Sequence, residues 1–429
     1  MGYLEQYDSA PDDQTRVGLV QKWIRSADWR PFFAELRERR PVLVTPAFTL
    51  LARHADVVEV LSRETVFTVR LYARSMDPTI DGPFMLSRDA TAVNWREKSI
   101  MRAVLRPEDL PAVRDIAGRL ADEALNRTAE DGRIEAVNEL GRYVPLRLCG
   151  EYFGFHGPDL ASMYRWSKAT QTDMFKNLKQ DPAVHDAAVT AGTELLRYLR
   201  DLLAEKRAEL AKAPDDPPQD VFARLVRTDL PEELGFDDHR LVANVAGLLI
   251  GAGETTAQAI VQALEQILRR PDVRGRAIEA ARGGDRAAFD PYVWEALRFN
   301  PINPLIFRLC ERPYTVAAGT PRATPIPAGT LVFALTAAAM SDPDAFAEPG
   351  SFRLDRPDPI ALHFGWGHHT CLGQHVAAAM VPEVVRRFLL RPDPRLLPGP
   401  DGAIDFQGGP FPERFVLAFG ESRRPQPDS

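Results

Sequence analysis

Residues 363–377 read HFGWGHHTCLGQHVA. Three glycines surround one cysteine in this stretch, Gly365, Gly367 and Gly373 around Cys371, and a helical pattern follows the cysteine. A thiolate at the N-terminus of a helix is stabilised by the helix dipole and by backbone N–H groups that lack a partner inside the helix. The segment is therefore suited to present Cys371 to a metal.

Histidines are concentrated in the same segment, which makes a zinc site the obvious rival interpretation. Four of the eight histidines lie there: His363, His368, His369 and His375. Zinc sites usually combine short paired spacings such as C-x2-C and H-x3-H, whereas this segment has one cysteine. A glycine-rich turn that carries histidines by chance is the third interpretation.

Seven positions of the segment match a known motif. Phe364, Gly365, Gly367, His369, Cys371, Gly373 and Ala377 resemble the haem-binding signature of the cytochrome P-450 family, F-G-x-G-x-H-x-C-x-G-x-x-x-A. The resemblance implies haem b as cofactor, with Cys371 as the axial thiolate of the iron. It also implies that Phe364 packs near the sulfur, that His369 reaches a haem propionate and that the glycines let backbone amides approach the sulfur.

A second motif lies upstream in a helical pattern. Glu295 and Arg298 are three residues apart and share one helix face. On their own they predict an exposed ion pair, worth well under about 1 kcal/mol. They also resemble the family's E-x-x-R pair, which implies a buried structural network with a later arginine, here Arg356.

A long helix is predicted from Asp237 to Arg269, and its middle carries three glycines, each costing up to about 1 kcal/mol relative to alanine. Residues 251–256, GAGETT, resemble the family's oxygen-activation motif. The resemblance implies that Thr255 and Glu254 form an alcohol–acid pair that delivers protons to dioxygen. The alternative is that the Thr255 hydroxyl bonds a helix carbonyl while Glu254 is solvated.

Three further residues are candidates for the haem propionates. Arg308 falls where the family places a propionate-binding arginine, although a surface ion pair would explain it equally. The family often carries His-x-x-x-Arg on a helix at the haem edge, and alignment on Pro107 puts Asn94 and Lys98 there. Both side chains can donate hydrogen bonds to a carboxylate.

The expected substrate pocket is apolar. By position, the resemblance places there Phe84, Met85, Leu248, Ala252, Pro304, Leu305, Ile306 and Phe411, each of which could instead be ordinary core. This lining predicts an apolar substrate of small to medium size. Arg70, Arg74 and Arg88 leave open an acidic group such as a carboxylate on that substrate.

Periodicity predicts a mainly α fold with a small strand-rich lobe. Helices are expected over 28–40, 54–64 and most of 93–300, and again from about 371 to 390; strands are expected over 41–46, 48–53 and within 305–336. Residues 66–91 are expected to form a long irregular loop. The resemblance implies a single cytochrome P-450 domain over residues 1–429, with the haem buried between the long central helix and the Cys371 segment.

Composition limits the partners. The formal net charge of −7 disfavours a nucleic-acid binder, and three scattered cysteines point to a reducing compartment. The N-terminus lacks the pattern of a signal peptide, and the longest uncharged stretch, 323–341, contains Pro325, Pro327 and Gly329, so we expect a cytoplasmic protein without a membrane anchor.

Electrons must come from outside, because no flavin or iron–sulfur motif is present. We expect a ferredoxin or flavodoxin with its NAD(P)H-dependent reductase. Four basic residues, Arg96, Lys98, Arg102 and Arg106, could form a docking surface for an acidic donor, or simply a solvated helix face.

The leading hypothesis is thus a haem-thiolate monooxygenase that uses dioxygen and two externally supplied electrons to oxidise an apolar substrate. A peroxide-driven haem peroxygenase is one alternative, disfavoured because its known relatives usually lack the acid–alcohol pair. A non-catalytic haem sensor or carrier is an alternative of another class, and a zinc-binding structural protein is a fourth.

Overall fold

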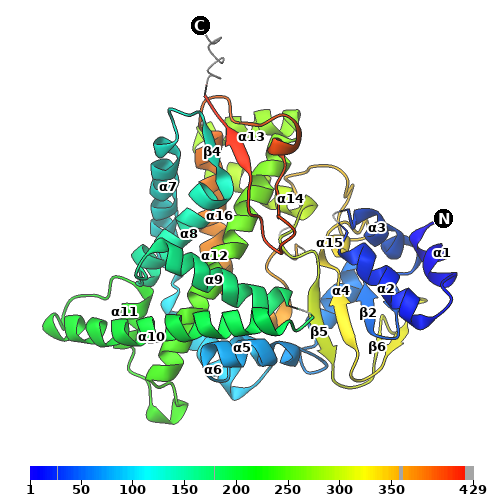
Figure 1. Ribbon diagram of the computed structural model, residues 1–429, viewed down its shortest axis with the longest axis horizontal. Coiled ribbons are helices and arrows are strands. Elements are labelled where there is room, and N and C mark those ends of the chain that lie inside the picture. Colours follow the sequence, from blue (N-terminus) through cyan, green and yellow to red (C-terminus); the bar gives the residue numbers. More distant parts are fainter. Residues whose placement is uncertain (27, 178, 357–360, 421–429) are drawn as a thin grey trace, which may run out of the picture. The chain divides into compact units, whose positions relative to one another are not determined.

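The computed structural model describes residues 1–26, 28–177, 179–356 and 361–420. The chain forms two compact units. The first comprises Met1–Ala73, Met85–Asn94 and Arg298–Cys371, and the second comprises Arg74–Phe84, Trp95–Leu297 and the chain from Leu372 onwards. The mainly helical fold with a smaller strand-rich part, predicted from periodicity, is confirmed (Figure 1).

A five-stranded sheet organises the first unit. Its strand order is β1 (Val42–Val44), β2 (Phe48–Leu51), β8 (Leu331–Ala334), β5 (Ile306–Cys310) and β3 (Phe67–Thr68). Strands β2 and β8 are parallel and the other neighbours are antiparallel. A separate hairpin pairs β6 (Tyr314–Val316) with β7 (Thr324–Ile326). The sheet joins the two chain segments, around 50 and around 310, in which strands are predicted.

Helices cover this sheet. They are α1 (Tyr3–Asp8), α2 (Asp13–Ile24), α3 (Arg30–Arg39), α4 (His54–Leu61) and the short α15 (Thr336–Ala339). Helices α3 and α4 are expected from the sequence, whereas α1 and α2 are not. The rings of Tyr3, Trp23 and Phe32 meet at centroid distances of 5.0 to 5.5 Å, so α1 and α2 are held by an aromatic cluster on α3.

The prediction of an irregular loop over 66–91 is wrong for much of its length. The segment contains β3, a 3-10 turn η1 (Arg70–Tyr72), helix α5 (Ala73–Ile80) and a second turn η2 (Met85–Ser87). Helix α5 is short and has Pro78 inside it, which hides its helical pattern. Its buried face is formed by Ser75, Met76, Thr79 and Ile80.

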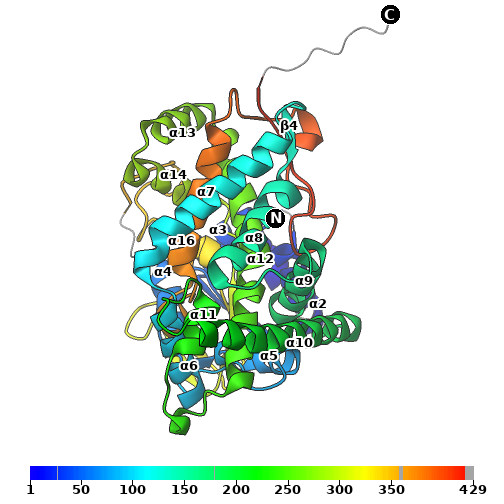
Figure 2. The same cartoon turned by 90° about the vertical axis from the view of Figure 1, so that its left-hand side faces the viewer.

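The second unit is built mainly of helices around α12 (Asp238–Leu268), whose N-cap is Asp237, the first residue of the predicted helix. Helices α8, α9, α10, α16 and the π-helix η4 all pack on α12, and α7 lies beside α16 (Figure 2). The helices wholly or mostly in this unit are α6 (Ala92–Val104), α7 (Leu110–Arg127), η4 (Ala136–Arg142), α8 (Tyr143–Leu148), η5 (Cys149–Phe153), α9 (Leu160–Lys176), α10 (Pro182–Lys212), α11 (Val221–Arg227), α13 (Pro271–Gly283), α14 (Arg286–Phe299) and α16 (Gln374–Leu389). Short 3-10 turns, η3 (Pro107–Asp109), η6 (Glu232–Leu234) and η9 (Gly399–Gly402), join them.

A small sheet that the sequence does not predict completes the second unit. Strand β10 (Val416–Ala418) pairs antiparallel with both β4 (Arg133–Glu135) and β9 (Arg395–Leu396). Each strand has only two or three residues. Such short strands carry too little alternation to be recognised without knowing their partners.

Close packing explains two of the three glycines of α12. A Cβ atom on Gly247 would lie 2.7 Å from the Phe84 ring, and one on Gly253 would lie 2.0 Å from the Ser167 hydroxyl. The missing side chains let Phe84 and α9 approach the helix. The packing gained there offsets the roughly 1 kcal/mol that each glycine costs a helix interior.

Candidate functional site

Cys371 lies at the end of a tight turn with its side chain exposed. The turn begins at Phe364, whose carbonyl oxygen accepts a 2.9 Å hydrogen bond from the Cys371 amide. Gly367 has a left-handed φ of +69°, and a Cβ there would lie 2.7 Å from the Leu61 carbonyl oxygen. Only glycine fits that position, so the backbone of the turn is fixed by its close approach to the end of α4.

His369 and Arg308 lie in the first unit with Cys371. The Nε2 atom of His369 is 3.0 Å from a carboxylate oxygen of Asp89, and both side chains are mostly buried. Arg308, on β5, is 4% exposed and donates a 2.8 Å hydrogen bond to the carbonyl oxygen of Phe307. Phe364 and Gly365 are half-buried, and Gly365 also has a left-handed φ, of +73°. Gly373 is the N-cap of α16.

The chemistry of these residues fits haem b, which needs a sulfur ligand and cations for its carboxylates. No salt bridge joins Arg308 to any carboxylate in the described residues, and burial lowers its pKa, against the opposing charges of Tyr72 and Asp89. A buried guanidinium without an ion-pair partner is costly unless an anion binds it. The first unit therefore contains both the exposed Cys371 and the buried Arg308, which forms no salt bridge to a carboxylate among the described residues.

Asn94 is placed differently from a propionate donor. Its side-chain amide donates to two backbone carbonyl oxygens, those of Met85 at 2.7 Å and Arg88 at 3.0 Å. The remaining side-chain atom, Oδ1, is buried without a partner and is an acceptor only. Asn94 therefore braces the turn before α6. Lys98, also assigned to the propionates by resemblance, is 4% exposed on the following turn of that helix.

The Thr255 side chain is half-exposed on α12, and its hydroxyl donates a 2.6 Å hydrogen bond to the Gly251 carbonyl oxygen. This is the back-bond considered from the sequence as the alternative to a catalytic hydroxyl. Gly251 is exposed and Ala252 half-exposed, so this stretch of α12 is accessible. Helix α12 runs as one α-helix through the motif.

Glu254 is 1% exposed, contrary to the idea that it is solvated. Arg142 holds it with three hydrogen bonds: Nε lies 3.0 and 3.3 Å from the two carboxylate oxygens, and a terminal nitrogen lies 2.8 Å from Oε2. The guanidinium also donates to Asn138 Oδ1 at 2.7 Å and to the Pro412 carbonyl oxygen at 2.9 Å. The acid of the motif is thus part of a buried ion pair.

This ion pair extends to a second carboxylate. Glu413 lies 3.3 Å from Arg142 and 2.6 Å from the Lys168 ammonium, which is partly exposed. The Tyr164 ring stacks under the Arg142 guanidinium at 4.5 Å. Burial raises the pKa of Glu254, while the hydrogen bonds and charge of Arg142 oppose that rise. Arg142 was not found from the sequence, because it lies far away on the π-helix η4 and no local pattern marks it.

Arg298 and Arg356, two of the three residues of the predicted structural network, contact the same segment. Glu295 and Arg298 are 5% and 3% exposed, so the surface-pair interpretation does not apply. Arg298 and the half-buried Arg356 both donate to the Ser351 carbonyl oxygen, at 3.3 and 2.8 Å, and both stack on the Phe346 ring. The two arginines therefore stabilise the same segment ahead of Cys371.

The expected pocket residues divide between the units. Met85 and the half-buried Pro304, Leu305 and Ile306 lie in the first unit; Phe84, Leu248, Ala252 and Phe411 lie in the second. Phe84 and Phe411 are each 1% exposed. The Lys176 ammonium lies 5.8 Å from the Phe411 ring centre, and burial lowers the pKa of Lys176 to about 8.

The expected docking surface is smaller than predicted. Arg102 and Arg106 are exposed, but Lys98 is buried and so presents no charge at the surface. Arg96 is half-buried and pairs with buried Glu97 at 3.5 Å. The idea that all four residues form one basic surface is therefore wrong, because only two of them present exposed charge.

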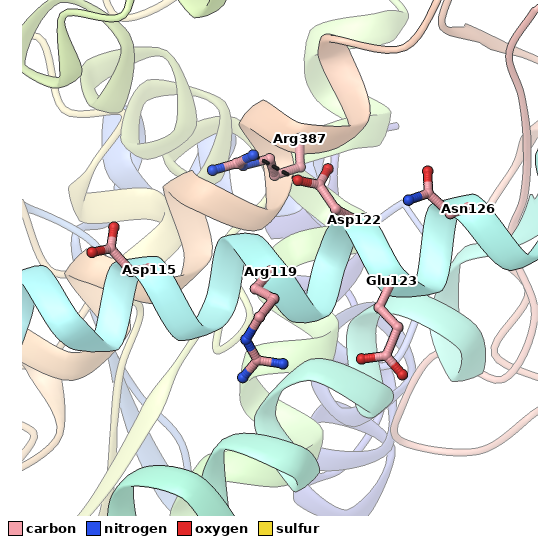
Figure 3. Close-up of a pocket in the computed structure, with 6 residues that line it drawn as sticks. All are labelled: Asp115, Arg119, Asp122, Glu123, Asn126 and Arg387. Atoms are coloured by element: carbon pink, nitrogen blue, oxygen red, sulfur yellow. Dashed lines mark hydrogen bonds and ion pairs between the residues drawn. The ribbon is translucent and has the colours of Figure 1, made fainter.

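A surface pocket of about 580 Å³ lies on α7 and α16, away from the predicted residues (Figure 3). Asp115, Arg119, Asp122, Glu123, Asn126 and Arg387 line it. Arg387 pairs with Asp122 at 2.6 Å inside the pocket, and Arg119 pairs with Glu151, which does not line it. Within the described residues, no group of three or more histidine, cysteine, aspartate or glutamate side chains could hold a metal ion.

Comparison with known proteins agrees with this fold. The family described as Cytochrome P450 matches residues 159–399, more than half of the chain, and the chain belongs to that family. It is a cytochrome P450 monooxygenase with haem b as cofactor. No helix among the described residues is long and apolar enough to cross a membrane.

Individual relatives are similar to this chain over most of its length. The chain is 29% identical over 388 residues to the vitamin D(3) 25-hydroxylase of Pseudonocardia autotrophica, covering 87% of this chain and 89% of the relative. It is 30% identical over 300 residues to the cytochrome P450 monooxygenase PikC of Streptomyces venezuelae, covering 70% and 64%. The crystal structure of CalO2 is similar in fold, with a TM-score of 0.76 at 20% identity, over 92% of this chain and 96% of that one.

Proposed function

We propose that the whole chain, residues 1–429, works as one catalytic domain that oxidises a small to medium apolar organic compound with dioxygen and two electrons from an external donor. One observation carries the proposal: the turn that exposes Cys371 lies in the same unit as Arg308, whose buried guanidinium forms no salt bridge to a carboxylate among the described residues. Haem b with a thiolate ligand supplies dioxygen activation and oxygen insertion. Cys371 would hold the iron, and Arg308 and His369 would bind the propionates.

The second unit supplies proton delivery. Thr255 and Glu254 are consecutive, but they are not hydrogen-bonded to each other in this structure. The Thr255 hydroxyl donates to the Gly251 carbonyl oxygen, and the Glu254 carboxylate accepts from Arg142. To pass on a proton, Glu254 must exchange part of its contact with Arg142 for a contact toward the accessible side of α12. The guanidinium already has other acceptors in Pro412 and Glu413, so this exchange leaves it hydrogen-bonded.

Replacing Thr255 by alanine tests the monooxygenase against the peroxygenase alternative. In a system reconstituted with reductase and ferredoxin or flavodoxin, we expect Thr255→Ala to keep its haem but to divert reducing equivalents to peroxide, because the relay hydroxyl is lost. Thr255→Ser, which keeps the hydroxyl, should couple as the wild type does. The measurement is product and peroxide formed per NAD(P)H consumed. If the wild-type protein were fully active with peroxide alone and inactive with the electron donor, the result would favour the peroxygenase.

The substrate class is tested by spectral titration of the holoprotein. Apolar compounds of increasing size should displace the water ligand of the iron and shift the haem absorption, each measured against its carboxylate analogue. We expect the neutral apolar compounds to bind. Tighter binding of the carboxylates would favour an acidic group on the substrate, the possibility that Arg70, Arg74 and Arg88 leave open. Of these three, Arg70 is paired with Glu311 at 2.9 Å. Binding of polar compounds alone would contradict an apolar pocket.

We further propose that the electron donor is a ferredoxin or flavodoxin that contacts the exposed residues Arg102 and Arg106. The turnover of the same reconstituted system reports on this contact. Because opposite charges on separate surfaces are screened by salt, turnover at a fixed donor concentration should fall as salt is added.

A further inference from the structure

The carboxylate of Asp89 is a feature of the first unit that the sequence did not single out. Its Oδ1 atom lies 3.0 Å from His369 Nε2, and its two oxygens lie 3.0 and 3.2 Å from the backbone nitrogen of Val69, which donates to them. The Asp89 and His369 side chains are 18% and 9% exposed. Asp89 thus joins the chain beside β3 to the turn that carries Cys371.

The turn that presents Asp89 is braced from two sides. Asn94 donates to the carbonyl oxygens of Met85 and Arg88, and the Thr91 backbone nitrogen donates to the Asp89 carbonyl oxygen at 2.6 Å. The position of the carboxylate is therefore set by the backbone on either side of it. This explains what Asn94 does in this chain, where it stands in place of the histidine common in the family.

The carboxylate also acts on Arg308. The charges of Tyr72 and Asp89 are the groups that favour the charged form of Arg308 against its burial. Asp89 is not in ion-pair contact with Arg308, so the guanidinium keeps its hydrogen-bonding capacity. One anion therefore contacts His369 directly and favours the charged form of Arg308, the two residues assigned to the haem propionates.

We propose that Asp89 is a positioning residue for the haem, which fixes the ring of His369 and places a protein carboxylate beside the propionate-binding groups. The proposal rests on the proposed haem roles of His369 and Arg308. A histidine bonded through one nitrogen to a carboxylate has its ring orientation fixed. The negative charge also favours the oxidised iron, because its total charge is more positive than that of the reduced iron.

The test uses the purified holoprotein and needs no turnover. Asp89→Asn keeps the shape of the side chain but removes its charge. We expect the haem to transfer to an excess of a haem-accepting apoprotein roughly 10-fold faster, the loss typical of removing such a partner. We also expect the reduction potential of the iron to rise. The reduced, carbon monoxide-bound variant should keep its thiolate absorption band, because Cys371 is untouched.

Glu311→Gln is the matched control. Glu311 is a neighbouring carboxylate that accepts hydrogen bonds from Thr68 and Arg70, and its loss removes one negative charge from the same region. It should match the wild type in both measurements. If Asp89→Asn also matches the wild type, the proposal is overturned. Faster haem loss without a change in potential overturns it as well, because general loosening would produce that result.

A second variant covers the case in which Asp89→Asn does not fold. Asp89→Glu retains the charge on a longer side chain, so we expect a potential close to the wild type with faster haem loss. Unchanged haem loss in Asp89→Glu would overturn the positioning role. A wild-type protein that binds haem without the thiolate band would instead refute the proposed function itself, so the two failures are distinguishable.

Discussion

Replacing Cys371 by serine should abolish the red-shifted absorption band of the reduced, carbon monoxide-bound protein and reduce turnover to the background level. The band depends on a thiolate ligand, and a serine oxygen cannot donate electron density to the iron as a thiolate does. Removing a partner of a metal ligand typically costs about 10–100-fold, and loss of the ligand itself should cost more. Optical spectra and product formation measure the two effects.

Cys310→Ser is the matched control for this experiment. Cys310 is fully buried on β5, and its thiol donates to the Arg312 carbonyl oxygen, a contact that a serine hydroxyl can replace. This variant should keep the band and the activity. A Cys371→Ser protein that retains the thiolate band would assign the iron ligand to another cysteine and remove the basis of the proposed function.

The sequence was most informative where one short segment carries both the chemistry and the geometry. The turn around Cys371 needs a left-handed glycine at Gly367, and the same residues make up the signature. The long helix α12 was predicted almost to its ends, because Asp237 caps it and apolar residues repeat along it. In both cases the cause of the structure is local, so it can be seen in the sequence.

The rest depends on residues that meet only after folding. Arg142 reaches Glu254 because Gly141 lets η4 approach α12, where a Cβ would lie 3.2 Å from the Ala257 Cα atom. Asp89 meets His369 although 280 residues separate them. Lys98 looks like part of a basic surface in the sequence and is buried in the structure. Neither such pairings nor the burial of one charge follow from local patterns.

Arg142→Leu should lower the free energy of unfolding by about 3–5 kcal/mol near neutral pH, which is the usual cost of breaking a fully buried ion pair. The side chains of Arg142 and Glu254 are only 4% and 1% exposed, so the carboxylate left behind cannot be solvated without local unfolding. Urea unfolding of the holoprotein measures the loss. Arg165→Leu is the control, since its pair with Glu194 is exposed and worth about 1 kcal/mol at most.

The pH dependence of the free energy of unfolding distinguishes the loss of the Arg142 charge from the loss of its packing contacts. Burial raises the pKa of Glu254 in the folded protein, so folding favours the protonated form, and the stability this gives is lost as pH rises through the folded value. Without Arg142, the pKa of Glu254 in the folded protein rises further. The difference in the free energy of unfolding between the wild type and Arg142→Leu should therefore shrink as pH falls toward about 4.3, the pKa of a glutamate in the unfolded chain. At that pH the variant buries a neutral acid.

The double variant Arg142→Leu/Glu254→Leu should recover much of the stability at neutral pH. An equal loss at every pH, or no recovery in the double variant, would mean that Arg142 contributes packing rather than charge.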